Sequence, residues 1–124
     1  MNQTMRFFVL FEGVAFATAG SIHRGVFIHG YEHGAASIAE TTIAVVLVAG
    51  LILTWVWPVH TRLIGLLAQS FAVQGTLVGL FTIAVGIGPR TIPDLMFHFG
   101  ILAVLAVGLG VAARSEVGQA RGTE

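Results

Sequence analysis

The sequence predicts an all-α integral membrane protein: a four-helix bundle of transmembrane helices with very little chain outside the bilayer. Hydrophobic residues make up 56% of the 124 residues and charged residues only 10%, whereas an ordinary soluble domain has roughly 25% charged residues. Four apolar segments each approach the roughly 20 residues that a helix needs to cross a bilayer. Short connections with turn residues separate these segments, which makes helical packing of neighbours the expected architecture.

We expect one domain over residues 1–124, with helices over about residues 5–25, 35–57, 61–86 and 92–113 and a polar tail over residues 114–124. Backbone amides in lipid must be hydrogen-bonded within their own segment, so each apolar run is expected to be helical. The first run resembles a signal peptide, but Glu12 lies inside it, and a charged residue there argues against cleavage.

The connections carry recognisable turn chemistry. Pro58-Val59-His60 is so short that the helices on either side of it must be antiparallel neighbours. Gly86-Ile87-Gly88-Pro89 is expected to end the third helix. Thr91-Ile92-Pro93-Asp94 then has the pattern of a capping box with proline in the first turn, so we expect Asp94 to have a structural role at the start of the fourth helix.

The placement of arginine indicates the orientation in the membrane. The end that holds the N-terminus carries more basic residues than the opposite end, with Arg6, Arg62, Arg114 and Arg121 against Arg24 and Arg90. By the positive-inside rule, both termini are predicted to be cytoplasmic, in a bacterial inner membrane. Arg62 is expected to be structural, marking the inner boundary of the third helix.

Composition excludes several classes of function. The formal net charge is zero, so there is no electrostatic argument for binding nucleic acid. Cysteine is absent, which excludes disulfides, thiolate metal sites and cysteine nucleophiles. No motif of a soluble enzyme or of nucleotide binding occurs. The expected partners are the lipid bilayer and either further copies of the chain or other subunits of a membrane complex, with small residues such as Gly75 and Gly79 allowing close helix packing.

Ionisable residues at membrane depth are costly and are usually functional. Glu12 and His23 are eleven residues apart in the sequence, about three helical turns, and therefore share one helix face if the first helix continues that far. The end of the bundle assigned as outer collects many such groups: His23, His29, Glu32, His33, Glu40, Asp94 and His98, with Arg24 and Arg90 as counter-charges.

Three cofactors fit this outer cluster. His29 and His33 have i, i+4 spacing and, with His98 or a carboxylate, suit a transition metal, provided that the second helix begins early enough to include them. Haem held by two imidazoles needs a histidine from each of two helices, such as His98 opposed by His23 or His33. A quinone needs a histidine or carboxylate for its carbonyl oxygen, which His98 and Glu40 can supply.

Two other functions stay open. Glu12, a carboxylate in the first helix of a small four-helix protein, suits a proton-coupled transporter or channel, because desolvation makes proton and substrate compete. Alternatively, the polar residues only tie the helices together, and the chain is a non-catalytic accessory subunit of a membrane complex.

Part of the sequence resembles a known family. Glu40, then Ala49-Gly50-Leu51, then Thr61-Arg62-Leu63 followed by Gly65-Leu66-Leu67, resembles the DoxX-like group of small bacterial four-helix membrane proteins, over about residues 37–74. The resemblance implies a four-helix bundle and a role near membrane quinone or redox enzymes. It extends to Glu40 and Arg62, whereas the histidine-rich segment over residues 23–33 departs from the group's pattern.

Overall fold

The computed structural model describes residues 2–115 and confirms the four-helix fold. The helices are α1 (Asn2–His23), α2 (Gly34–Val56), α3 (Thr61–Ala84) and α4 (Ile92–Arg114), and a short 3₁₀ helix, η1 (Pro58–His60), joins α2 to α3. All four helices are long and apolar enough to cross a membrane. The largest difference from the predicted bounds is at the N-terminus, where α1 already begins at Asn2. From residue 116 on, the predicted polar tail lies outside the described residues.

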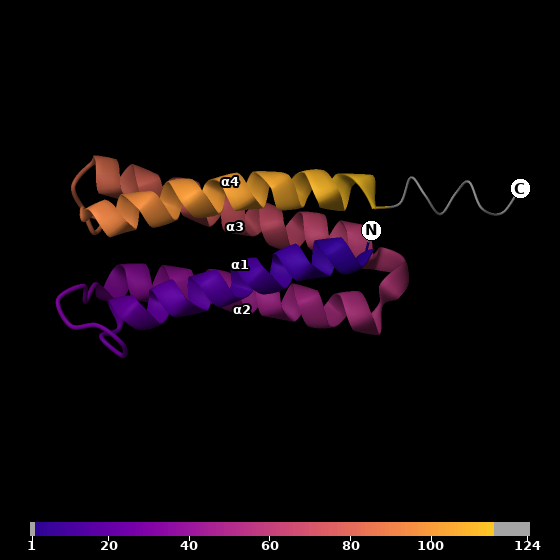
Figure 1. Cartoon of the computed structure of the whole chain (residues 1–124), viewed down its shortest axis with the longest axis horizontal. Helices are drawn as coiled ribbons and strands as arrows, with labels where there is room; N and C mark the ends of the chain where they lie inside the picture. Colours follow the sequence, from indigo (N-terminus) through magenta and orange to yellow (C-terminus); the bar gives the residue numbers. More distant parts are fainter. Residues whose placement is uncertain (1, 116–124) are drawn as a thin grey trace, which may run out of the picture.

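The bundle consists of two antiparallel helix pairs that lie side by side, α1 with α2 and α3 with α4 (Figure 1). The α1–α2 and α3–α4 connections meet at one end, which we call the loop end; η1 and the start of α1 lie at the opposite end, the turn end. The arginines are divided between these ends as predicted, with Arg24 and Arg90 at the loop end and Arg6, Arg62 and Arg114 at the turn end. Arg121 lies outside the described residues.

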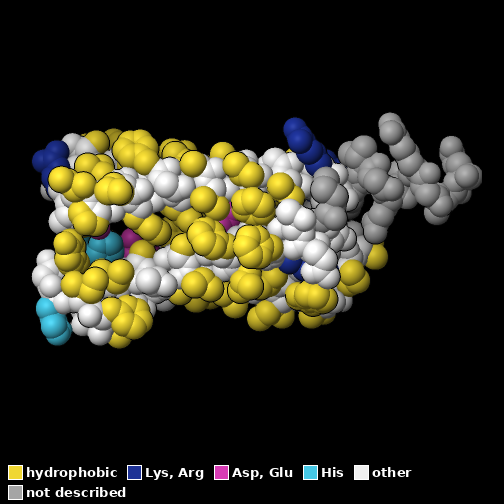
Figure 2. Space-filling view, viewed as in Figure 1, with side chains coloured by type: hydrophobic (Ala, Val, Ile, Leu, Met, Phe, Trp, Pro, Cys, Tyr) yellow, Lys and Arg dark blue, Asp and Glu magenta, His cyan; other side chains and the backbone are white. Residues whose placement is uncertain are grey.

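The core is apolar and the outer surface is apolar as well. Val9, Phe16, Leu47 and Leu105 are almost fully buried where the helices meet. Large hydrophobic side chains also cover the outside of the bundle along its length (Figure 2). A soluble protein of this size avoids such a continuous apolar surface, so the outer faces are those that contact lipid.

Glycines allow the helices to approach one another closely. A Cβ atom on Gly20 would lie 2.8 Å from Thr41 Oγ1 and 3.4 Å from the Ser37 backbone oxygen, so α1 packs directly on the backbone of α2. Gly75 and Gly79 are used inside the bundle, where they make room for Ile43 and His98. These two glycines therefore serve packing within one chain. Self-association of the protein stays a prediction, and it would have to use other faces of the bundle.

At the turn end, Arg6 ties α1 to α2. Its Nε donates to Thr54 Oγ1 at 3.0 Å and its Nη2 donates to the Thr54 backbone oxygen at 2.6 Å. The guanidinium also lies 3.9 Å from the centre of the Trp55 ring, a cation–π contact that favours arginine over lysine at this position.

We predict that Gly20→Leu destabilises the bundle by about 1–3 kcal/mol, because the added side chain must displace the α2 backbone. Thermal unfolding in detergent, followed by circular dichroism, measures this. The matched control is Gly110→Leu on α4, where a Cβ atom meets nothing within 4 Å. Equal unfolding temperatures for the two variants would contradict the packing described for α1 and α2.

Candidate functional site

At the loop end, His33 precedes α2 as its N-cap residue. The backbone N–H of Ala36 donates to His33 Nδ1 at 3.2 Å, so in the neutral ring Nε2 carries the hydrogen and donates to the Ile87 backbone oxygen at 3.2 Å. His33 therefore fastens the α1–α2 connection to the α3–α4 connection, and both of its ring nitrogens are used.

The first turn of α4 presents a carboxylate to the bundle interior. Thr91 and Asp94 form the predicted capping box: the backbone N–H and the hydroxyl of Thr91 donate to Asp94 Oδ2, while Asp94 N–H donates to Thr91 Oγ1. This arrangement occupies one carboxylate oxygen. The other oxygen, Oδ1, points away from the cap toward α1.

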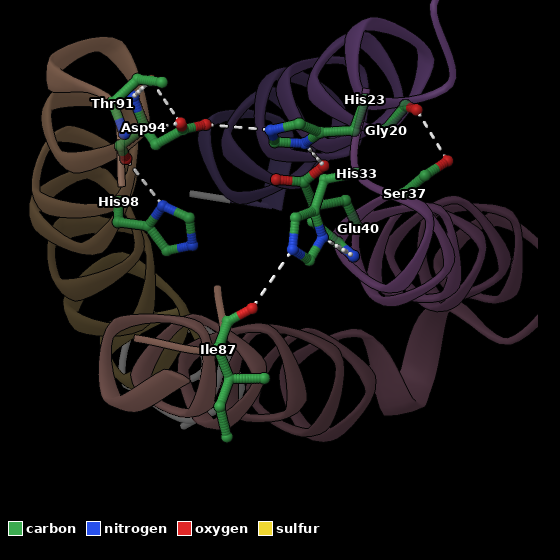
Figure 3. Close-up of polar contacts among 10 residues, drawn as sticks. Gly20, His23, His33, Ser37, Glu40, Ile87, Thr91, Asp94 and His98 are labelled. Atoms are coloured by element: carbon green, nitrogen blue, oxygen red, sulfur yellow. Dashed lines mark hydrogen bonds and ion pairs between the residues drawn. The ribbon is translucent and has the colours of Figure 1, made fainter. Parts of the chain in front are cut away.

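His23, the last residue of α1, lies between two carboxylates. Its Nδ1 is 2.6 Å from Glu40 Oε2 on α2, and its Nε2 is 2.9 Å from Asp94 Oδ1 on α4 (Figure 3). All three side chains are buried. We call this set the Glu40–His23–Asp94 network. It joins three helices at the loop end by side chains alone.

The network requires a particular number of hydrogens. Two hydrogen bonds need two hydrogens, whereas a neutral imidazole carries one and ionised carboxylates carry none. The second hydrogen is therefore shared among Glu40, His23 and Asp94, and the network as a whole has a single negative charge. In this row of hydrogen-bonded groups, the shared hydrogen can lie between His23 and Glu40 or between His23 and Asp94.

One atom of the network has no partner within the described chain. Glu40 Oε1 is buried and makes no hydrogen bond, although buried polar atoms are almost always paired. Glu40 lines a cavity of about 450 Å³ formed mainly by α2, α3 and the α3–α4 connection. Most of its lining is apolar, with Phe16, Ile43, Phe71 and Ile87 among its walls. We call it the ligand cavity.

His98 also lines the ligand cavity. Its Nδ1 donates to the Asp94 backbone oxygen at 2.7 Å, since a carbonyl can only accept. In the neutral ring, Nε2 is then an acceptor, and it makes no hydrogen bond within residues 2–115. Gly79 gives the ring its space, because a Cβ atom there would lie 2.6 Å from His98 Nε2.

A second cavity, of about 430 Å³, lies on the other side of the network. It is formed by α1, α4 and the α1–α2 connection, and His23 and Asp94 line it. Figure 2 views the seam between α1 and α4, where histidine and acidic side chains are visible at the bottom of a hollow. The Glu40–His23–Asp94 network therefore separates two cavities.

The structure brings three of the candidate site residues into contact and places a fourth close by in the sequence. His23, Glu40 and Asp94 are in direct contact, and His98 follows one turn after Asp94 on α4. Asp94 is structural as predicted, but it also has a role in the network that the sequence reading did not assign. The signal was available: a capping box occupies one carboxylate oxygen, and the second oxygen must point elsewhere. Gly79 was missed as a site residue, because only the rotation of α3 brings it against His98.

The predicted metal site over His29, His33 and His98 is not formed. Gly30 has φ +102° and α2 begins only at Gly34, so His29 and His33 are not one turn apart on a helix and do not share a face with Glu40. The His29 side chain is 92% exposed and lies 3.3 Å from Glu32. Among residues 2–115, no group of three or more histidine, cysteine, aspartate or glutamate side chains is placed to hold a metal ion.

Glu32 belongs to the exposed α1–α2 connection and not to the buried site. The backbone N–H groups of Glu32 itself and of Gly30, with a smaller contribution from His29, hold the pKa of Glu32 below its ordinary value. The negative charge that results stays at the surface, so it adds nothing to the chemistry of the cavities.

The opposed imidazoles expected for haem are also not available in this geometry. His98 Nε2 faces the ligand cavity, but His23 and His33, its predicted partners, use both of their ring nitrogens in hydrogen bonds. A second axial histidine would have to break one of these contacts.

Glu12 lies near the middle of the bundle, away from both cavities. Gln69 Nε2 donates to Glu12 Oε1 and Oε2 at 3.0 Å each, and both residues are fully buried. Gln69 Oε1 has no partner within the described chain. The pair links α1 to α3, which lie diagonally across the bundle, and Gly108 on α4 leaves room for it.

Comparison with known proteins adds no family assignment to this geometry. No protein family profile, no curated protein and no solved structure matches the chain. The chemistry of the site therefore has to be argued from its own residues.

We predict that Glu12→Gln folds as well as the wild type or up to about 1 kcal/mol better, because its new amide can donate to the unpaired Gln69 Oε1. Glu12→Leu leaves Gln69 without any partner and costs about 1–3 kcal/mol. Chemical unfolding in detergent distinguishes the two variants. A Gln variant as unstable as the Leu variant would show that the pairing of Glu12 with Gln69 is not what stabilises this position.

A similar pair of variants tests the hydrogen count in the network. In Glu40→Gln the amide donates to His23 Nδ1 while His23 Nε2 donates to Asp94, so both bonds survive without the shared hydrogen. We expect this variant to unfold within about 1 kcal/mol of the wild type, and Glu40→Ala to be about 1–3 kcal/mol less stable. Equal losses for both variants would contradict the arrangement.

Proposed function

We propose that this protein is a bacterial inner-membrane protein whose ligand cavity binds the ring of a lipid-soluble, quinone-type redox cofactor. One observation carries the proposal: Glu40 Oε1 is buried and unpaired, and Glu40 lines a mostly apolar cavity. An unpaired acceptor in apolar surroundings is costly unless a ligand supplies the missing hydrogen bond.

The shape and lining of the cavity support a flat apolar ring with polar substituents. Its volume of about 450 Å³ lies within the range usual for small-molecule sites. The walls are mainly hydrocarbon, and Glu40 and His98 present polar atoms from α2 and α4. Redox rings of this type carry oxygen atoms that exchange protons, and histidine and carboxylate side chains are the usual groups for that exchange.

The network supplies a route for a proton leaving or reaching such a ring. A hydrogen passed from Glu40 to His23 Nδ1 allows the hydrogen on Nε2 to pass to Asp94 Oδ1. Asp94 lines the second cavity. One hydrogen then enters the network on the ligand side and another leaves it on the opposite side, with no change in the total.

The predictions on location and relatives fit the same proposal. Arg6, Arg62 and Arg114 at the turn end, against Arg24 and Arg90 at the loop end, support cytoplasmic termini and an outer ligand cavity. A relationship to DoxX-like proteins, proposed on the segment around Glu40 and Arg62, agrees with a role beside membrane redox enzymes. The chain would then act as a binding subunit of such an assembly.

The other functions have less support. Neither of the two cavities is lined by Glu12, whose carboxyl is occupied by Gln69, so a solute path past Glu12 has no observation in its favour. A purely accessory role leaves Glu40 Oε1 unexplained. A metal ion or haem would need ligands that are already used elsewhere in the site.

We predict that protein reconstituted in lipid nanodiscs binds a short-tailed benzoquinone or its hydroquinone, and that Gly79→Leu weakens this binding by about tenfold or more, because the added side chain displaces His98 and fills the cavity. Equilibrium binding of the radiolabelled ring measures it. Gly100→Leu on the outer side of α4, where a Cβ atom meets nothing within 4 Å, is the matched control. If the wild type binds neither the quinone nor the hydroquinone, the proposed function is wrong.

A further inference from the structure

The buried polar groups of the ligand cavity have a definite hydrogen-bonding polarity, which is clearest at His98. Its Nδ1 hydrogen is used on the Asp94 backbone oxygen, so its free atom, Nε2, offers a lone pair to the cavity. The acceptor character follows from the bond on the other side of the ring, because the carbonyl of Asp94 cannot donate.

Glu40 presents an acceptor as well. The short contact between Glu40 Oε2 and His23 Nδ1 contains one of the two hydrogens of the network, and the contact between His23 Nε2 and Asp94 contains the other. None of the network's hydrogens is left for Glu40 Oε1. This atom therefore offers lone pairs only, and it is one of the two buried side-chain atoms within residues 2–115 that lack a partner.

The hydroxyl groups along α3 repeat this polarity. Thr76 Oγ1 donates to the Ala72 backbone oxygen at 2.8 Å, and Thr82 Oγ1 donates to the Gly79 backbone oxygen at 2.7 Å. Each hydroxyl donates its only hydrogen to a backbone oxygen of α3, so toward the cavity each oxygen can only accept. The ring N–H of His33 is likewise used, in its hydrogen bond to the Ile87 backbone oxygen. Gln74 also lines the cavity and carries N–H donors, but its side chain is exposed, whereas His98 and Glu40 are buried.

We infer that the ligand cavity selects the reduced, hydroxyl-bearing form of its ring ligand, a hydroquinone, over the oxidised quinone. This inference rests on the proposed function and names the form that is bound. A quinone carbonyl is an acceptor and cannot pair with His98 Nε2 or Glu40 Oε1, whereas each hydroxyl of a hydroquinone can donate to one of them. The two acceptors come from different helices and face a common space (Figure 3), an arrangement that suits two separate hydroxyl groups on one ring.

Binding of three rings that share one carbon skeleton tests the inference: a short-tailed hydroquinone kept reduced without oxygen, the corresponding quinone, and the dimethyl ether of the hydroquinone. The ether cannot be oxidised and has no hydrogen to donate. In nanodiscs, we expect the hydroquinone to bind about tenfold tighter, or more, than the quinone or the ether, since one neutral hydrogen bond corresponds to about that factor.

A variant in the cavity links this preference to one atom. His98→Phe keeps a ring of similar shape and removes Nε2, so the preference for hydroquinone over quinone should fall by about tenfold while the quinone still binds. The same substitution at His60, an exposed residue at the turn end, should leave the preference unchanged. If His98→Phe fails to fold, the comparison of the three rings in the wild type still decides the inference.

The possible results separate the two proposals. Equal or tighter binding of the quinone or of the ether overturns the selection of the reduced form and leaves the proposed function standing. Binding of none of the rings overturns both. Binding of a primary alkylammonium with none of the rings also overturns both, because the acceptors would then serve a cation.

Discussion

The position of His23 between Glu40 and Asp94 determines how the loop end of the bundle is built. Each imidazole nitrogen reaches a different helix, and two hydrogens satisfy both contacts. In an apolar solvent such as lipid, polar side chains that find no partner are far more costly than in water. The three helices must therefore keep the rotation that brings these groups together, and that rotation also places Glu40 and His98 along one cavity.

Two of the buried carboxyl groups, those of Glu40 and Glu12, are held in different ways. Glu40 shares a hydrogen with a titratable neighbour and lines a cavity, whereas Glu12 is held by a neutral amide in a closely packed region beside Gly108. Burial of an acidic residue in a membrane helix is therefore not sufficient to assign it a function. The neighbouring groups and the free space around the carboxyl decide between a structural tie and a reactive site.

The fold could be predicted from the sequence because it depends on segment length and on short turns, which are local properties. The capping box at Thr91 and Asp94 was equally local. The site was predictable only as a set of candidates: His23, Glu40 and Asp94 meet because of how three helices are rotated, and no local pattern specifies that. His29 and His33 were misleading for the opposite reason, since an attractive spacing lay in a segment that Gly30 keeps out of a helix.

The contact of His33 with Ile87 and the walls of the ligand cavity bear on how a ligand reaches that cavity. The contact fastens the α1–α2 connection to the α3–α4 connection at the loop end of the bundle. The ligand cavity is also lined by Phe71 and Val78, side chains that are exposed on the outer surface of α3. These exposed walls give a molecule dissolved in the hydrocarbon of the bilayer a lateral route to the cavity.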